Sequence, residues 1–174
     1  AIGILTTAAG SQYTGIVASL DTVTVQGIPS VTIELTGFDF AYNAAQDSLA
    51  ASIANIAWTG VDAPAALTSL GVADELAVTG SLLVAVDQNF IAQATFSLTT
   101  TTQDVNDGTI NLTGASVLVF ELTAAAVWAG TGFALNGPVG SRTIDNSDAT
   151  GFEATNVTIE LVIVNEMTTG PPAN

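Results

Sequence analysis

The stretch VTIELTGFDFAY (Val31–Tyr42) alternates apolar and polar side chains on both sides of a glycine. Val31, Ile33 and Leu35 hold the apolar positions before Gly37, and three aromatic residues hold them after it. A period of two is typical of a β-strand with one buried face, and a glycine inside such a run indicates a bulge or a bend. We therefore predict one long, bent strand here.

Runs with the same period recur along the chain and predict an all-β protein. Clusters of turn-forming residues separate these runs, among them Asp87–Asn89 and Asn106–Gly108, and they predict antiparallel hairpins. Helix formers are more frequent in Ala63–Glu75, which is predicted to form a short helix or a loop across the end of a sheet. The other predicted strands are Leu49–Trp58, Leu76–Val86, Phe90–Thr101, Thr109–Thr123 and Ala154–Asn165. A helix is the alternative for the first of these, because Leu49, Ile53 and Ile56 also suit one.

The preferred architecture is a set of long antiparallel hairpins that form a sandwich or an elongated two-layer sheet. A β-solenoid is the alternative, and it is disfavoured because Thr-Gly dipeptides recur at irregular spacings instead of a fixed period. Residues 1–167 are predicted to form a single all-β domain with an apolar N-terminal segment. Residues 168–174, TTGPPAN, are predicted to be a linker-like tail because proline cannot donate to a β-ladder.

The charge balance is strongly acidic and limits the partners of the chain. Sixteen Asp and Glu residues stand against Arg142 alone, with no Lys or His, so the formal net charge is −15. Such a chain cannot neutralise a run of phosphates, which excludes nucleic-acid binding and attraction to an anionic membrane. No apolar stretch reaches the roughly 20 residues that a membrane-spanning helix needs, so no membrane insertion is expected.

Catalysis is disfavoured because the chain lacks His, Cys and Lys, and no Ser has a His to activate it. The catalytic mechanism still open to such a chain uses a pair of carboxylates, as in glycosidases. The candidate carboxylates are Glu34, Glu121 and Glu160, all in predicted strands. Glu34 and Glu160 hold the same place in the pentapeptide VTIEL, which occurs twice. We expect both to lie on a solvated strand face, with the Val, Ile and Leu of each copy toward a core, and we expect a protein that is not an enzyme.

No cofactor is required by the sequence, and calcium is the one that its residues suit, since hard oxygen ligands gather in two predicted loops. The preferred interpretation is that these Asp and Asn residues only form turns. A calcium-assisted carbohydrate-binding or adhesion domain, with surface glycans as partners, is therefore the second functional hypothesis. The candidate calcium ligands are Asp104, Asn106, Asp107, Asp145, Asn146 and Asp148.

The segments VWAGTG (Val127–Gly132) and GFEATN (Gly151–Asn156), with a Gly- and Asp-containing stretch between them, lie within Leu112–Val164. This region resembles a repeat module of very large secreted or surface proteins of aquatic bacteria. Gly27–Asn43 and Asp47–Ser52 look like the hairpin that precedes it in that module. The resemblance implies extracellular or cell-surface work of a structural or adhesive kind, and it carries no catalytic residues.

The composition is compatible with the same kind of function. We expect a non-enzymatic extracellular structural protein that associates with copies of itself or with neighbouring modules in a filament, sheath or adhesin stalk. No Lys is available to block the edge of a sheet, and the apolar N-terminal segment is predicted to be donated to a neighbouring copy. The predicted assembly residues are Ala1, Ile2, Gly3, Ile4 and Leu5.

Overall fold

The computed structural model describes residues 1–166, and the predicted tail at 168–174 lies outside them. Nine strands and two short 3₁₀ helices make up the described part of the chain. The strands are β1 (Ile2–Thr6), β2 (Gln12–Val25), β3 (Val31–Gln46), β4 (Asp74–Val86), β5 (Phe90–Asn106), β6 (Asn111–Thr131), β7 (Ala134–Asn136), β8 (Thr143–Asp145) and β9 (Thr150–Asn165). The 3₁₀ helices are η1 (Trp58–Gly60) and η2 (Ala65–Ser69).

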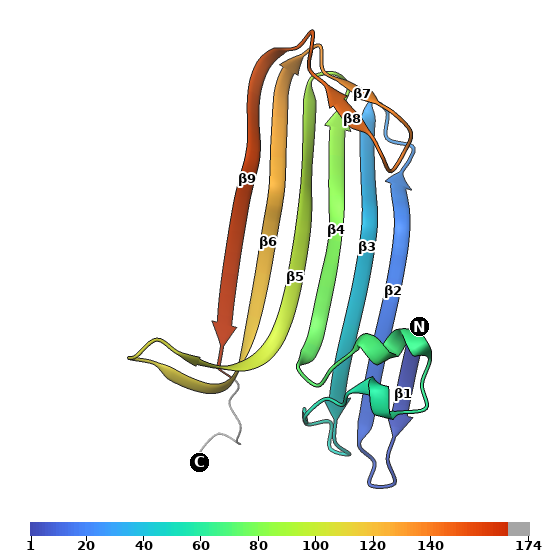
Figure 1. Cartoon of the computed structure of the whole chain (residues 1–174), viewed down its shortest axis with the longest axis vertical. Helices are drawn as coiled ribbons and strands as arrows, with labels where there is room; N and C mark the ends of the chain where they lie inside the picture. The colour runs from blue at the N-terminus through green and yellow to red at the C-terminus, as the bar shows by residue number, and fades with distance from the viewer. Residues whose placement is uncertain (167–174) are drawn as a thin grey trace.

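Seven strands form one antiparallel sheet in the order β1-β2-β3-β4-β5-β6-β9, and β7 pairs with β8 in a separate hairpin. Each strand of the large sheet pairs with the next one in sequence, except that the β7–β8 hairpin is inserted between β6 and β9. Figure 1 shows the resulting elongated meander, with the small hairpin at its upper end. The prediction of an all-β fold built from long antiparallel hairpins is confirmed.

One predicted strand, Leu49–Trp58, is wrong. Asp47 Oδ1 accepts the backbone N–H groups of Leu49 and Ala51 at 2.8 and 2.9 Å, which turns the chain tightly. After an isolated bridge between Gln46 and Ser52, the chain leaves the sheet and runs into η1 and η2. This loop crosses the lower end of the sheet, as predicted for Ala63–Glu75.

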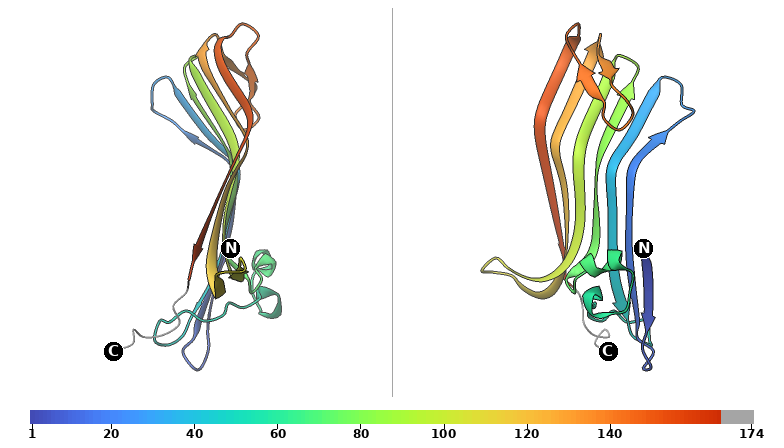
Figure 2. Two further views of the ribbon diagram at one scale, coloured as in Figure 1. Left: turned by 90° about the vertical axis from the view of Figure 1, so that its left-hand side faces the viewer. Right: turned by 45° about the vertical axis from the view of Figure 1, so that its right-hand side comes forward.

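The sheet bends at about half its length, because several strands carry an irregularity at that level (Figure 2). In β3 the bend is at Gly37, with φ of 56°, where the register to β4 shifts between Thr36 and Asp39. Ala124 of β6 and Asn156 of β9 have φ of 50° and 56° next to the register shifts between those strands. The predicted bend at Gly37 is therefore confirmed as part of a line of bends across the sheet.

The β7–β8 hairpin and the loop between β3 and β4 pack on the same face of the sheet, at its two ends (Figure 2). We call this the capped face. At the upper end, Trp128 and Ile91 pack with Phe133, and Leu135 and Ile144 of the hairpin cover them. This cluster is one of two separate cores in the described residues.

The second core, at the lower end, is organised around Trp58. Its indole lies across β1 and β2, where a Cβ on Gly3 would come within 2.7 Å of the ring and one on Gly15 within 2.6 Å. Glycine at both positions lets the ring approach the backbone closely. Leu67 and Leu70 of the loop complete this core. The N-terminal strand thus lies in its own sheet beside Trp58.

Asn43 of β3 ties the lower loop to the sheet. Its side chain is 1% exposed, accepts the Trp58 Nε1–H at 2.9 Å, and donates to the carbonyls of Ile56 and Gly71 at 3.0 and 2.8 Å. Every polar atom of this buried amide therefore has a partner, which is the condition for burying it at low cost.

The opposite face of the sheet, which we call the open face, has no described element packed on it. Cross-strand partners share a face, so the register defines its rows of side chains. One row is Val25, Ile33, Val84, Ala92, Val127 and Ala154. Another is Ala18, Phe40, Val78, Leu98, Phe120 and Leu161. Both rows are wholly apolar.

Candidate functional site

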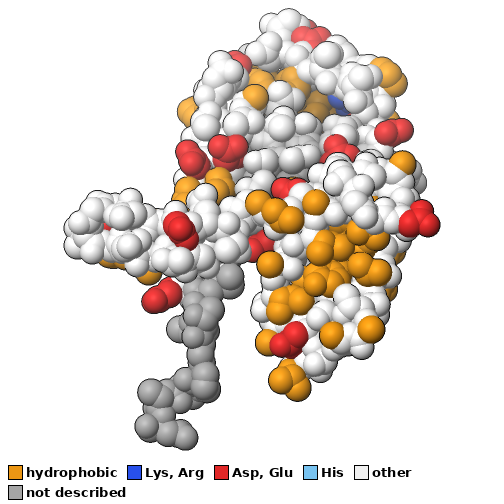
Figure 3. Space-filling view, turned by 60° about the horizontal axis from the view of Figure 1, so that its bottom comes forward, with side chains coloured by type: hydrophobic (Ala, Val, Ile, Leu, Met, Phe, Trp, Pro, Cys, Tyr) orange, Lys and Arg blue, Asp and Glu red, His pale blue; other side chains and the backbone are white. Residues whose placement is uncertain are grey.

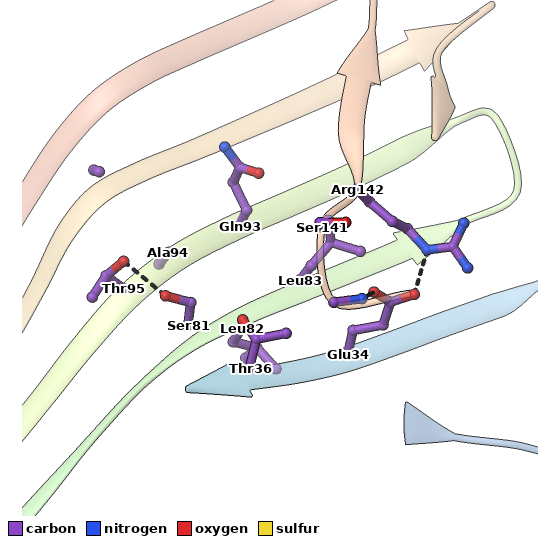
Figure 4. A pocket seen from close by; sticks show the side chains of 12 residues that line it. Glu34, Thr36, Ser81, Leu82, Leu83, Gln93, Ala94, Thr95, Ser141 and Arg142 are labelled. Atoms are coloured by element: carbon purple, nitrogen blue, oxygen red, sulfur yellow. Dashed lines mark hydrogen bonds and ion pairs between the residues drawn. The ribbon is translucent and has the colours of Figure 1, made fainter. Parts of the chain in front are cut away.

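The candidate site is a buried ion pair under the β7–β8 hairpin. Glu34 lies on the capped face of β3 and is 3% exposed. Its Oε1 accepts the Nε–H of Arg142, and its Oε2 accepts the Gly140 backbone N–H at 3.1 Å. Figure 4 shows Arg142 reaching Glu34 from the hairpin, which is separated from β3 by about a hundred residues of chain.

The tip of the hairpin reaches the sheet because its turn is tight. Gly137 and Gly140 have φ of 90° and 83°, a left-handed conformation that glycine adopts without strain. A Cβ on Gly140 would come within 2.7 Å of the Thr22 hydroxyl of β2, so the tip spans from β3 toward the neighbouring strand.

The predicted environment of Glu34 is wrong. The sequence analysis predicted a solvated strand face, whereas Glu34 is buried and pairs with the Arg142 guanidinium. Asp145, close to Arg142 in the hairpin, accepts from Ser147 and Asn136 instead. Burial of a carboxylate requires a compensating charge and hydrogen bonds, and the hairpin supplies both.

A hollow of about 230 Å³ lies beside the ion pair, between the hairpin and the bend. Its lining is mixed, with hydroxyl and amide groups beside leucine and alanine side chains, and the Ser81 and Thr95 hydroxyls are 3.0 Å apart. Glu34 is the carboxylate that lines the hollow, and Arg142 already occupies it. The arrangement fastens the hairpin to the sheet, and it does not place a second carboxylate opposite Glu34.

The other two candidate carboxylates lie elsewhere on the capped face. Glu121 and Glu160 are direct cross-strand partners, with β4 and β5 between them and Glu34. Three strand spacings amount to about 14 Å, beyond the roughly 9.5 Å upper limit for the two carboxyl groups of a glycosidase. Glu34 therefore cannot act with either residue on one glycosidic bond.

Glu121 and Glu160 belong to a polar row that crosses the middle of the capped face. Glu121 is partly buried and accepts from the Ser97 hydroxyl at 3.4 Å, whereas Glu160 is exposed. The expectation that Glu34 and Glu160 share one environment is therefore wrong. The row runs Ser19, Asp39, Thr79, Ser97, Glu121 and Glu160.

The six candidate calcium ligands lie at opposite ends of the sheet, three of them at the end of β5 and in the turn after it, and three at the end of β8 and in the loop before β9. Asp104 Oδ1 accepts the Gly114 N–H at 2.8 Å, Asn106 accepts from Gly108, and Asn146 donates to Glu153. Among residues 1–166, no three acidic, His or Cys side chains are placed to hold a metal ion. Figure 3 shows the acidic side chains dispersed over the side in view. Calcium binding stays a prediction, which thermal unfolding with and without calcium would test.

Hydrogen bonds within these turns lower two pKa values. The pKa of the Asp107 carboxyl lies below its usual 3.8 because the backbone N–H groups of Ile110 and Thr109 donate to it at 2.7 and 2.8 Å. The pKa of Asp145 is lowered by the backbone N–H and the hydroxyl of Ser147. Both turns therefore use their carboxylates as structural acceptors.

These shifts predict a pH dependence of folding. Since the folded pKa of each group lies below its unfolded value, the turns stabilise the native state above pH 3.8, and this contribution is lost as the pH falls through the folded pKa. In an NMR titration, the carboxyl carbons of Asp107 and Asp145 should each titrate below pH 3.8 in the folded protein. Midpoints at or above pH 3.8 would contradict the assignment.

Neither tryptophan offers a stacking platform for a sugar. Trp58 is 1% exposed and Trp128 is 6% exposed, so each ring is used in packing. Trp128 Nε1 has no hydrogen-bond partner in the described part of the chain, in contrast to Trp58 Nε1.

The sequence analysis did not identify Asn43 as a residue that joins the lower loop to the sheet. An Asn at the end of a predicted strand is equally typical of a turn, so its position carried no signal for this role.

The fold and the site together define an elongated antiparallel meander with a hairpin fastened to it by a buried ion pair. Comparison with protein-family models, curated proteins and solved structures finds no match to this chain. Among residues 1–166, none of the helices has the length and apolar character needed to cross a membrane.

Proposed function

We propose that the chain is a non-enzymatic extracellular structural protein, a self-associating subunit or module of a filament, sheath or adhesin stalk. The observation that carries this proposal is the open face. Monomeric soluble proteins seldom expose a continuous apolar patch of more than about 300–600 Å², and a larger one marks an interaction site. An apolar face that runs the length of a seven-stranded sheet exceeds this size.

Two unprotected edges add to this support. β9 pairs with β6 alone, and its side chains are exposed on both faces for most of its length. β1 covers only part of β2, so that residues 18–25 are unpaired on that side. Edge strands of monomers are commonly blocked by Lys, Pro or a bulge; β9 contains neither Lys nor Pro, and below its bend at Asn156 residues 159–165 form a regular edge. Edge-to-edge pairing would extend the sheet from copy to copy.

The predicted donation of Ala1–Leu5 remains a proposal in a more specific form. In the structure this segment pairs with residues of β2 in its own chain and packs beside Trp58. Donation to a neighbour would exchange these contacts for identical ones made between copies, as in domain swapping.

Edge-to-edge pairing through β9 is tested with a double variant, Val162→Lys combined with Val164→Lys. Two charges on β9 should shorten or abolish polymers seen by negative-stain electron microscopy, because an added strand would bury them. The matched control is Thr109→Lys with Ile110→Lys, which changes the net charge equally in an exposed hairpin loop. A wild-type chain that stays monomeric up to millimolar concentration in sedimentation would end the proposal.

A further inference from the structure

The two faces of the sheet differ sharply in the same region. The row from Ala18 to Leu161 on the open face is apolar throughout, and the adjacent row from Ser19 to Glu160 on the capped face is polar throughout. None of the cross-strand partners that the register places on the open face is Asp, Glu or Arg. The interior of the open face therefore carries no charge.

Exposure confirms that large side chains of this face lie open to solvent. Leu82 of the central strand β4 is 39% exposed, and Leu161 and Ile159 of β9 are each 50% exposed. Ile2 and Ile4 of β1 add to the same face, because Ile2 pairs with Ile16 in a row that continues to Tyr42. Apolar side chains thus extend from one edge of the sheet to the other.

Resting on the proposed function, we propose that the open face is covered by the open face of a second copy of this chain, giving a two-sheet sandwich with the capped faces outside. Two antiparallel sheets pack face to face about 10 Å apart when their inner faces are apolar. The sandwich that the sequence predicts is then completed between two chains.

The area of the face is sufficient for a stable dimer. Strands of 13 to 17 residues in β3, β4 and β5 reach about 45 Å, and the six long strands span about 24 Å, with the five-residue β1 beside only the lower part of β2. The face then measures about 1,100 Å² per copy, above the roughly 800 Å² per partner of a standard specific interface.

Charge favours a second copy over other occupants. A two-fold interface brings a surface against itself, so a face without charges avoids like-charge contacts, whereas the capped face would bring Glu121 and Glu160 together. In the sandwich most carboxylates of each copy remain in water. A lipid surface is a poorer match, because a chain of net charge −15 is repelled by anionic headgroups.

The test compares the same substitution on the two faces. Leu82→Asp places a charge at the centre of the open face, and Thr123→Asp places one at an exposed position of the capped face, beside Thr95. In analytical ultracentrifugation Leu82→Asp should weaken dimerisation at least ~100-fold, because the carboxylate would be buried without a partner, and Thr123→Asp should leave it unchanged. Circular dichroism verifies that both variants remain folded, as expected for solvent-exposed sites.

The absence of cysteine allows a second, independent measurement. With a short bismaleimide linker, Leu82→Cys should form cross-linked dimers and Thr123→Cys should not. If the wild type associates but Leu82→Asp has no effect and Leu82→Cys does not cross-link, the face-to-face dimer is overturned while self-association through the edges stands. A monomeric wild type overturns both, and a monomer that binds neutral phosphatidylcholine vesicles through Leu82 would assign the face to lipid.

Discussion

Replacing Asn43 by alanine should lower the free energy of unfolding by about 3–5 kcal/mol, because three buried polar groups lose their partner at once. Those groups are Trp58 Nε1–H and the carbonyls of Ile56 and Gly71, at 2.8 to 3.0 Å from the amide. The loss should appear in urea unfolding followed by tryptophan fluorescence. A cost below about 1 kcal/mol would mean that the amide does not hold the loop to the sheet.

The isosteric variant Asn43→Asp separates hydrogen bonding from packing. A carboxylate can still accept from Trp58, but it faces two carbonyl oxygens where the amide donated. Burial and these oxygens should raise the folded pKa of the new carboxyl above its unfolded value of about 3.9. The deficit relative to wild type should therefore be largest near pH 7 and shrink as the pH falls through the raised pKa.

The two tryptophans provide a matched control for the same network. Trp58→Phe and Trp128→Phe both remove ring volume from a core, but Trp58 donates to Asn43 and Trp128 Nε1 has no partner within residues 1–166. Trp58→Phe should therefore cost about 1–2 kcal/mol more than Trp128→Phe, since it leaves the Asn43 oxygen without its donor. Equal costs would assign the role of Trp58 to packing alone.

Local patterns were sufficient to predict most strands of this sheet. Alternation and turn residues lie within a few positions of one another, so they predict β3, the β4–β5 hairpin and the bend at Gly37. The segment Leu49–Trp58 was wrongly predicted to be a strand, because Ile53 and Ile56 suit a strand as well as a loop that packs on Trp58. Whether such a segment forms a strand or a loop is decided by contacts with distant residues of the sheet.

The site could not be predicted, because its parts come together only in the folded chain. Glu34 meets the hairpin more than a hundred positions away, and no spacing rule connects them. The two copies of VTIEL show this limit most clearly. Periodicity identifies Ile159 and Leu161 as one face, but it cannot say whether that face is covered, and both are 50% exposed.

Those two pentapeptides also supply the control for a prediction on the ion pair. Glu34→Leu should open the β7–β8 hairpin far more often, because Arg142 and the Gly140 N–H both lose their acceptor. Loss of the charged hydrogen bond and of the backbone bond should weaken the closed hairpin by about 2 kcal/mol. Glu160→Leu makes the same change in the exposed copy of the pentapeptide and should have little effect.

The chain contains its own reporter of this opening, since Arg142 is its single Lys or Arg and so its one tryptic cleavage site. When opening and closing are fast relative to cleavage, the rate of proteolysis follows the population of the open form. A change of about 2 kcal/mol then predicts tryptic cleavage after Arg142 about 30-fold faster in Glu34→Leu than in wild type. Glu160→Leu should be cleaved at the wild-type rate, with mass spectrometry locating the cut. Equal rates in Glu34→Leu and wild type would show that the apolar contacts of Leu135 and Ile144 hold the hairpin without the ion pair.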